Sequence, residues 1–126
     1  MINQAVNYPA DLSKQKRLLK AAQFQQVFSN KTHHFSNRYL RVIVAPNDIQ
    51  HWRLGLAISK KAAKRAVDRN RIKRHIRETF RVQFAQTDIA RAYDLVIMAK
   101  PDAKKACNAD LRTATKQLFI DIASKC

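Results

Sequence analysis

The sequence is poor in glycine, in acidic residues and in long apolar runs. One glycine in 126 residues excludes the glycine-rich loops that hold nucleotide phosphates. No apolar run approaches the roughly 20 residues needed to cross a bilayer, and the first residues lack the basic and apolar regions of a secretory signal. We therefore expect a cytoplasmic protein with no membrane partner.

The residues that usually carry hydrolytic or metal chemistry are few and scattered. The nine acidic residues include one glutamate and form no DxD or ExK pattern, so a metal site for phosphodiester cleavage is not expected. Cys107 and Cys126 lack the spacing of zinc ligands, and we expect free thiols. His33 and His34 are expected in a polar loop. We predict no catalytic residue, no metal site and no organic cofactor in this chain.

Positive charge is what the sequence has in excess. Lysine and arginine total 25, the formal net charge is +16 and the sequence pI is about 10.6. A disordered polycation is not expected, because 46% of the residues are hydrophobic and recur with regular periods. A folded domain with this charge predicts a polyanionic partner, and nucleic acid fits better than a membrane surface.

Apolar periodicity predicts one folded domain, residues 18–126, preceded by a flexible basic arm, residues 1–17. A short helix should place Phe24, Val27 and Phe28 on one face and end near Ser29 and Asn30. A long amphipathic helix follows from an i+4 apolar series and should end before Thr87 and Asp88; the series is Ile72, Ile76, Phe80 and Phe84. A last helix with Asn108 as its N-cap should bury Leu111, Ala114, Leu118 and Ile122.

Alternating and continuous apolar runs predict the strands. Residues 38–46 and 52–59 alternate, and we interpret them as a hairpin whose turn contains Pro46, Asn47 and Asp48. The first strand should direct Leu40, Val42 and Val44 to one face; the second should direct Trp52, Leu54, Leu56 and Ile58 to one face and Arg53, Gly55, Ala57 and Ser59 to the other. Gly55 lies in a strand interior, which indicates a close approach by another group. Residues 93–100 form an almost continuous apolar run, typical of a strand covered on both faces.

The densest charge lies between residues 60 and 77, where nine basic residues stand against one acidic residue, Asp68. A solvated helix face is the simple interpretation, but like charges four residues apart destabilise a helix, and Glu78 alone is placed to offset Arg74. Bound phosphates would remove this repulsion, with counterion release driving the binding. His75 lies in the same helix and is expected to add to the nucleic-acid contact rather than to catalyse a reaction.

The segment SKKAAKRAVDRNRIKRHIRETFR, residues 59–81, resembles the basic helix of the protein subunit of bacterial ribonuclease P, whose signature is an Arg-Asn-Arg core. The segments FQQVF, RLGLAIS and YDLVIMAK agree with that family in order and spacing, so that the resemblance covers about residues 18–124. Two regions depart from it: SNKTHH and AAKRAVD lack glycines that family members often have, so the resemblance does not define the turn geometry there.

The resemblance implies an α+β fold: a single-domain α-β-β-β-α-β-α sandwich with a mixed four-stranded sheet. It also implies a left-handed βαβ crossover, against the usual right-handed rule, and similarity to a small-subunit ribosomal protein domain. By the same resemblance, the protein binds the catalytic ribonuclease P RNA, with a 1:1 ratio expected. That RNA, with Mg²⁺ bound mainly by the RNA, removes the 5′ leader of precursor tRNA.

Two sets of site residues follow from the resemblance. The basic segment would contact the catalytic RNA through Lys60, Lys61, Lys64, Arg65, Arg69, Asn70, Arg71, Lys73, Arg74 and Arg77. The resemblance also implies a cleft between the first helix and the open sheet face that would hold the single-stranded leader, lined by Phe24 and Phe28. The residue pattern supports this independently, because Gly55, Ala57 and Ser59 would form a floor of small side chains and Tyr39 and Arg41 a wall. Aromatic and arginine surfaces stack on bases with little sequence preference. Simple core packing remains an equal interpretation for Phe24 and Phe28. A ribosomal or chaperone-like RNA-binding protein outside any enzyme is the alternative function.

Overall fold

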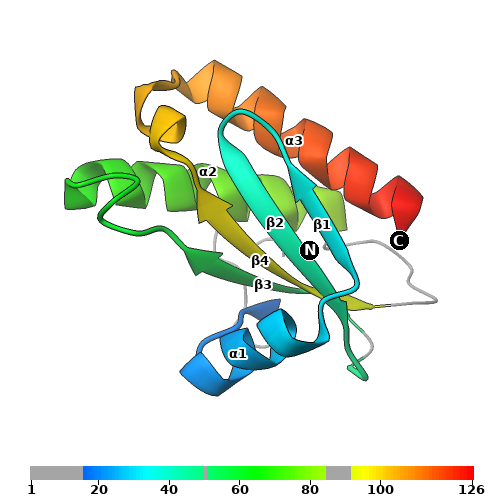
Figure 1. The fold of residues 1–126 in the computed structure, drawn as a ribbon. Helices are drawn as coiled ribbons and strands as arrows, with labels where there is room; N and C mark the ends of the chain where they lie inside the picture. The colour runs from blue at the N-terminus through cyan, green and yellow to red at the C-terminus, as the bar shows by residue number, and fades with distance from the viewer. Residues whose placement is uncertain (1–15, 50, 85–91) are drawn as a thin grey trace, which may run out of the picture.

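The computed structural model describes residues 16–49, 51–84 and 92–126. In these ranges one sheet is covered by helices on both faces (Figure 1). The elements in chain order are α1 (Ala21–Asn30), β1 (His33–Ser36), β2 (Leu40–Pro46), β3 (Arg53–Ala57), α2 (Ala66–Phe84), β4 (Tyr93–Ala99), the short 3₁₀ helix η2 (Pro101–Lys105) and α3 (Asn108–Lys125). The predicted α+β order of helices and strands is confirmed.

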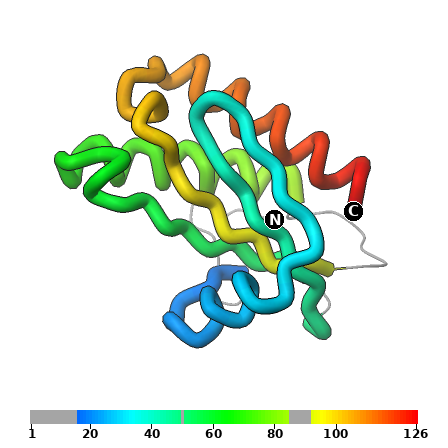
Figure 2. The backbone as a smooth tube through the Cα atoms, viewed as in Figure 1, coloured from blue at the N-terminus to red at the C-terminus, as the bar shows by residue number. Residues whose placement is uncertain are grey.

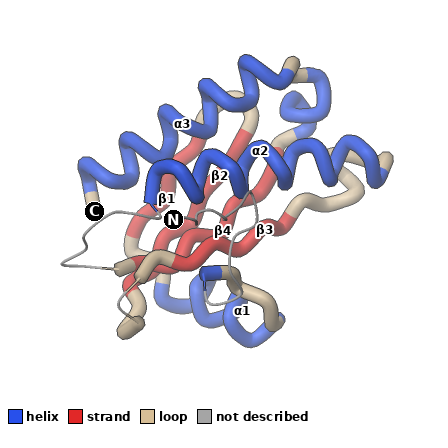
Figure 3. The backbone as a smooth tube through the Cα atoms, turned by 180° about the vertical axis from the view of Figure 1, so that it is seen from behind, coloured by secondary structure: helices blue, strands red, loops and turns tan. Residues whose placement is uncertain are grey.

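The sheet is mixed, with strand order β1-β2-β4-β3. The β1–β2 and β2–β4 pairs are antiparallel, and β3 and β4 are parallel neighbours joined through α2. In Figure 1 α2 passes behind the sheet, and Figure 3, seen from behind, shows α2 and α3 in front of the strands. When the molecule is turned so that β3 and β4 point upward with α2 behind the sheet, β4 lies to the right of β3. A right-handed crossover would place β4 to the left, so this crossover is left-handed, as expected.

The predicted hairpin between strands 38–46 and 52–59 is wrong. β2 forms its hairpin with β1, and β4 lies between β2 and β3 (Figure 2). The turn chemistry after β2 marks where the strand ends but carries no information about its partner. A strand that is apolar on both faces must take a central position, and β4 is that strand, with Tyr93 to Ile97 all buried.

A second correction concerns His33 and His34, which lie in β1 and not in a polar loop. This strand is short and lies at the sheet edge, and its residues alternate between half-buried and exposed. Histidine carries little strand propensity, so the pattern HHFS gives a weak signal. Pairing with β2 over four residues, from His33 opposite Val44 to Ser36 opposite Arg41, decides the structure.

The main core fills the space between the sheet and the pair α2 and α3. All four members of the predicted α2 series, Ile72, Ile76, Phe80 and Phe84, are buried, as are the β2 residues Leu40, Val42 and Val44. Trp52 stacks on Phe84 with ring centroids 4.6 Å apart, and Phe119 closes the aromatic cluster. The predicted end of α2 before Thr87 lies outside the described residues.

A smaller core lies on the other face of the sheet, under α1. It contains Leu18, Val27, Ile43, Ala45 and Val96, with Phe24, Ala57 and Met98 packed at its margin. The close approach expected at Gly55 is confirmed, because a Cβ there would lie 2.8 Å from Cε2 of Phe24 and 2.9 Å from Cδ1 of Leu18. The absent side chain therefore lets α1 and the segment before it pack directly on β3.

Both ends of the described fold differ in detail from the prediction. Arg17, assigned to the arm, forms an isolated parallel bridge with Leu54 of β3, and the rest of that arm, residues 1–15, lies outside the described residues. The N-cap of α3 is Cys107 rather than Asn108, since its sulfur accepts from the backbone N–H of Asp110. Across the described ranges, no helix is long and apolar enough to span a membrane.

Candidate nucleic-acid interface

The predicted basic residues gather on α2 and on the connection that precedes it. Those before the helix are exposed, and within the helix Asn70 and Arg74 are exposed while the others are half-buried. The exposed residues of the connection are Lys60, Lys61, Lys64 and Arg65, and the half-buried ones of α2 are Arg69, Arg71, Lys73 and Arg77. The apolar stripe of α2 faces the core, so the basic residues are left on its outer sides.

Two of these arginines also hold the fold together. Arg69 donates from Nη1 to the carbonyl oxygens of Ala63 and Lys64 at 2.9 and 2.7 Å, which fixes the connection before α2. Arg71 donates to Oδ1 of Asn108 at 2.9 Å and to the carbonyl oxygen of Lys104 at 3.2 Å, which ties α2 to the start of α3. Substitutions at Arg69 or Arg71 would therefore change the structure as well as the charge.

Little acidic charge offsets this surface. Among the described residues the ion pair found within the basic segment joins Arg65 and Asp68, at 3.8 Å, with the Arg65 side chain largely exposed. Such surface pairs contribute little, about 0 to 1 kcal/mol. The basic surface, defined here as the ten residues predicted to contact catalytic RNA, therefore keeps a positive field that attracts a polyanion.

His75 is only 5% exposed, and neither ring nitrogen has a hydrogen-bond partner among the described residues. The expectation that it adds to an RNA contact is therefore wrong for this structure. Its position explains the burial: it stands directly before Ile76 and three residues after Ile72, so it falls beside the buried stripe of α2.

The face of the sheet that α1 covers extends beyond the helix as an exposed sheet row. Register places Ser36, Arg41, Met98 and Ala57 side by side across the four strands. Ser36 and Arg41 are exposed, whereas Met98 and Ala57 are half-buried at the margin of the smaller core. The row combines a cation, a thioether and small side chains, which suits contact with unpaired bases.

The two phenylalanines of α1 differ in exposure. Val27 is buried against the sheet, and at about 100° per residue Phe24 and Phe28 project to one side of it. Phe24 is half-buried in the smaller core, while Phe28 is 37% exposed. Core packing therefore accounts for Phe24, and Phe28 is the aromatic surface available to a ligand.

Tyr39 lies apart from the arrangement predicted for the cleft, whereas Ser59 stays a predicted cleft residue. Tyr39 packs against the main core, and the guanidinium carbon of Arg38 lies 5.4 Å from its ring centroid. Residues 38 and 39 form a bend, so the strand alternation that would have placed Tyr39 beside Arg41 starts only at Leu40. Ser59 is exposed after β3, and its hydroxyl accepts from the backbone N–H of Ala62 at 3.1 Å.

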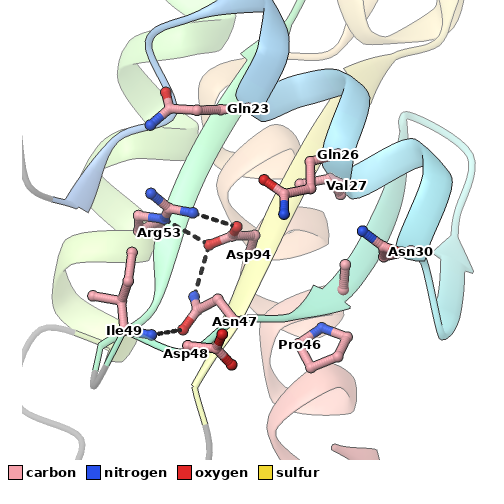
Figure 4. A pocket seen from close by; sticks show the side chains of 11 residues that line it. Gln23, Gln26, Val27, Asn30, Pro46, Asn47, Asp48, Ile49, Arg53 and Asp94 are labelled. Carbon is pink, nitrogen blue, oxygen red and sulfur yellow. Dashed lines mark hydrogen bonds and ion pairs between the residues drawn. The ribbon is translucent and has the colours of Figure 1, made fainter.

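The opposite side of α1 carries a polar pocket that the sequence did not predict, with a volume of about 340 Å³ (Figure 4). Asp94 lies at its base and accepts from Nε and Nη2 of Arg53, at 2.8 and 2.7 Å, and from Nδ2 of Asn47 at 2.7 Å. The hydrogen bond with Asp94 raises the pKa of Arg53. Because Arg53 is neutralised by Asp94 and Asp48 adds negative charge, this pocket is less suited to phosphate than the basic surface.

No group of three or more histidine, cysteine, aspartate or glutamate side chains placed to hold a metal ion is found in the ranges that the structure describes. Both cysteines are free thiols, as predicted. The described residues offer three surfaces suited to binding: a basic helix, an exposed sheet row and an exposed aromatic ring.

Comparison with known proteins agrees with this arrangement. The family model described as Ribonuclease P matches residues 12–123. The Ribonuclease P protein component of Idiomarina loihiensis is 42% identical over 125 residues, covering 99% of this chain and 94% of the relative. That of Stutzerimonas stutzeri is 43% identical over 106 residues, covering 84% of this chain and 79% of the relative.

Solved structures show the same fold. The RNase P protein of Staphylococcus aureus superposes with a TM-score of 0.74 at 35% identity, covering 86% of this chain and 94% of that one. The protein from Thermotoga maritima, at 24% identity, shares the fold with a TM-score of 0.68. The family match spans most of the sequence, including the basic helix and the strands around it. The chain therefore belongs to the family of ribonuclease P protein components.

Proposed function

We propose that this chain is the RNA-binding subunit of a ribonuclease P in which the RNA, not the protein, performs catalysis. The observation that carries the proposal is the basic surface of α2, whose charges exceed the acidic residues placed to offset them. Self-repulsion on a folded helix is unfavourable until phosphates neutralise it, and the released counterions favour the complex. A large folded RNA supplies those phosphates.

The exposed sheet row and Phe28 form the second part of the proposal. They would receive the unpaired 5′ leader of precursor tRNA, with the Phe28 ring stacking on a base and Arg41 contacting the strand. Such stacking contributes about 1 to 3 kcal/mol per base and tolerates any sequence. The basic surface and the leader surface use different elements, so one chain could contact enzyme RNA and substrate together.

Metal ions and stoichiometry follow from the same proposal. Mg²⁺ would be bound mainly by the catalytic RNA, and the protein would raise the RNA's affinity for substrate and for Mg²⁺ by neutralising phosphates. One protein would bind one RNA, in the cytoplasm where that RNA acts. The side chains of this chain would position RNA and would not take part in bond cleavage.

A reconstitution assay tests the proposal. Precursor tRNA is incubated with ribonuclease P RNA at low Mg²⁺, with and without the full-length protein, and release of the 5′ leader is measured. We expect cleavage to become efficient only with protein, and the protein alone to cleave nothing. Absence of stimulation would favour an RNA-binding role outside this enzyme, and cleavage by the protein alone would refute RNA-based catalysis.

A further inference from the structure

A second cavity, of about 160 Å³, lies where the first described residues meet α2 at the β3 edge of the sheet. Its lining combines three cations with an apolar floor: Arg17, Lys73 and Arg77 with Leu18, Leu19, Leu54 and Leu56. None of the residues that line it is acidic. The cavity therefore joins the basic surface of α2 to a residue outside the predicted interface, Arg17.

The position of Arg17 is set by the backbone. Its parallel bridge with Leu54 adds one residue of chain to the edge of β3, and the N–H of Leu18 donates to the carbonyl oxygen of Leu54 at 2.9 Å. Because strand neighbours point to opposite faces, Leu18 enters the smaller core and Arg17 is directed to the α2 side. The backbone pairing with β3 therefore holds Arg17 next to the basic residues of α2.

The three cations lack the partners that such groups normally have. No side-chain hydrogen bond or ion pair joins Arg17, Lys73 or Arg77 to any of the residues described, and Nε of Arg17 is shielded from solvent without a partner. Buried donors are nearly always satisfied, and like charges around one cavity repel. Packing of the arginine stem on leucine explains its burial but leaves both the donor and the charge unmatched.

We propose that this cavity is a phosphate-binding subsite that takes a phosphodiester of RNA. The inference rests on the proposed function and adds Arg17 to the residues that contact RNA. A guanidinium presents a fork of donors that matches phosphate oxygens, while Lys73 contributes a point charge. The cavity holds the equivalent of about five waters at ~30 Å³ each, enough for a phosphate group and its nearest waters. A strand bound there continues from α2 toward the segment that leads into α1.

An NMR titration of the intact protein tests the site without any substitution. The Nε–H signal of Arg17 is followed as inorganic phosphate replaces chloride at constant ionic strength. We expect a saturable shift of that signal, while the Nε–H signal of Arg53, already bonded to Asp94 at 2.8 Å, stays in place. An Arg17 signal that ignores phosphate, or that moves no more than that of Arg53, would overturn the phosphate subsite.

Substitution then distinguishes RNA from free phosphate. Arg17→Gln is compared with Lys125→Gln, an exposed position on α3 with the same charge change. Binding to catalytic RNA and, in the assembled enzyme, to precursor tRNA is measured over a range of salt concentrations. We expect Arg17→Gln to lower the log-log salt slope for one of these RNAs by about 0.7 to 0.9, and Lys125→Gln to leave both slopes unchanged.

The two binding measurements, with catalytic RNA and with precursor tRNA, identify which strand occupies the cavity. A lower slope for catalytic RNA assigns the site to enzyme assembly, and one for precursor tRNA assigns it to the leader. Unchanged salt slopes for both RNAs, together with a phosphate-dependent Arg17 signal, would show a free-phosphate site and overturn the RNA assignment. Failure of the wild-type protein to stimulate cleavage is a separate result, because it defeats the proposed function without altering the NMR titration.

Discussion

The close packing of α1 on the sheet depends on a single residue, Gly55. The sequence indicated a close approach at this strand position but could not name the approaching group, because contacts between distant segments have no local signal. In the structure that group is the ring of Phe24 together with Leu18. The same contact explains why Phe24 packs in the smaller core while Phe28 remains exposed.

Gly55→Ala should destabilise the protein by about 1 to 3 kcal/mol, because the added methyl overlaps the Phe24 ring and overpacked cores must shift. Urea unfolding followed by circular dichroism measures the change. The double variant Gly55→Ala with Phe24→Leu should recover part of the loss, since the smaller side chain makes room. Equal stability of Gly55→Ala and wild type would show that α1 does not pack this closely.

The two cysteines should differ in reactivity. Cys107 is exposed, whereas Cys126 is half-buried against the main core, and that burial raises the pKa of its thiol. A raised pKa lowers the thiolate fraction at a given pH, and the thiolate is the reacting form. Iodoacetamide at neutral pH should therefore modify Cys107 first, as mass spectrometry of timed samples would show. In urea the two rates should converge; faster modification of Cys126 in the native state would contradict its packing.

At the scale of elements, apolar patterns predict where helices and strands lie better than they predict which strands pair. The i+4 series of α2 and the inward face of β2 were predictable because burial imposes a period on one segment. Strand pairing is not predictable from alternation, because the same alternation fits several partners, and the expected β2–β3 hairpin does not form. The expected position of Tyr39 is wrong for a related reason: strand alternation does not continue through the bend at residues 38 and 39, which only the structure reveals.

Asp94 connects β4 to β3 and to the turn after β2, a network for which no local sequence pattern exists. Asp94→Ala should destabilise the protein by about 3 kcal/mol, because Arg53, whose side chain is 14% exposed, would lose the carboxylate that neutralises it. Thermal and urea unfolding would measure the loss. Asp102→Ala is the matched control: its pair with Arg38 is exposed, and stability should change little. Similar losses of stability in both variants would show that Asp94 contributes no more than an exposed ion pair.

At the scale of the whole molecule, composition and one motif carried most of the functional prediction. The excess of 16 positive charges predicted a polyanion, and the Arg-Asn-Arg core pointed to the family that the comparisons then showed. What the sequence could not separate was charge that binds RNA from charge that holds the fold. Arg69 and Arg71 make internal hydrogen bonds, whereas Arg74 is exposed and has none with the residues described.

Two variants test the central claim that different surfaces bind catalytic RNA and leader: Arg74→Ala on α2 and Phe28→Ala on α1. The measurement is a reconstituted assay that gives, for each variant, the affinity for catalytic RNA and the KM for precursors with long and with very short leaders. Circular dichroism first establishes that both variants are folded.

Arg74→Ala should weaken binding to catalytic RNA and lower its salt slope by about 0.7 to 0.9, with KM in the saturated enzyme unchanged. Phe28→Ala should leave that binding intact and raise KM roughly tenfold for long leaders, equivalent to ~1.4 kcal/mol of lost stacking, and not for short ones. Equal loss of RNA affinity in both variants, without any dependence on leader length, would contradict the account.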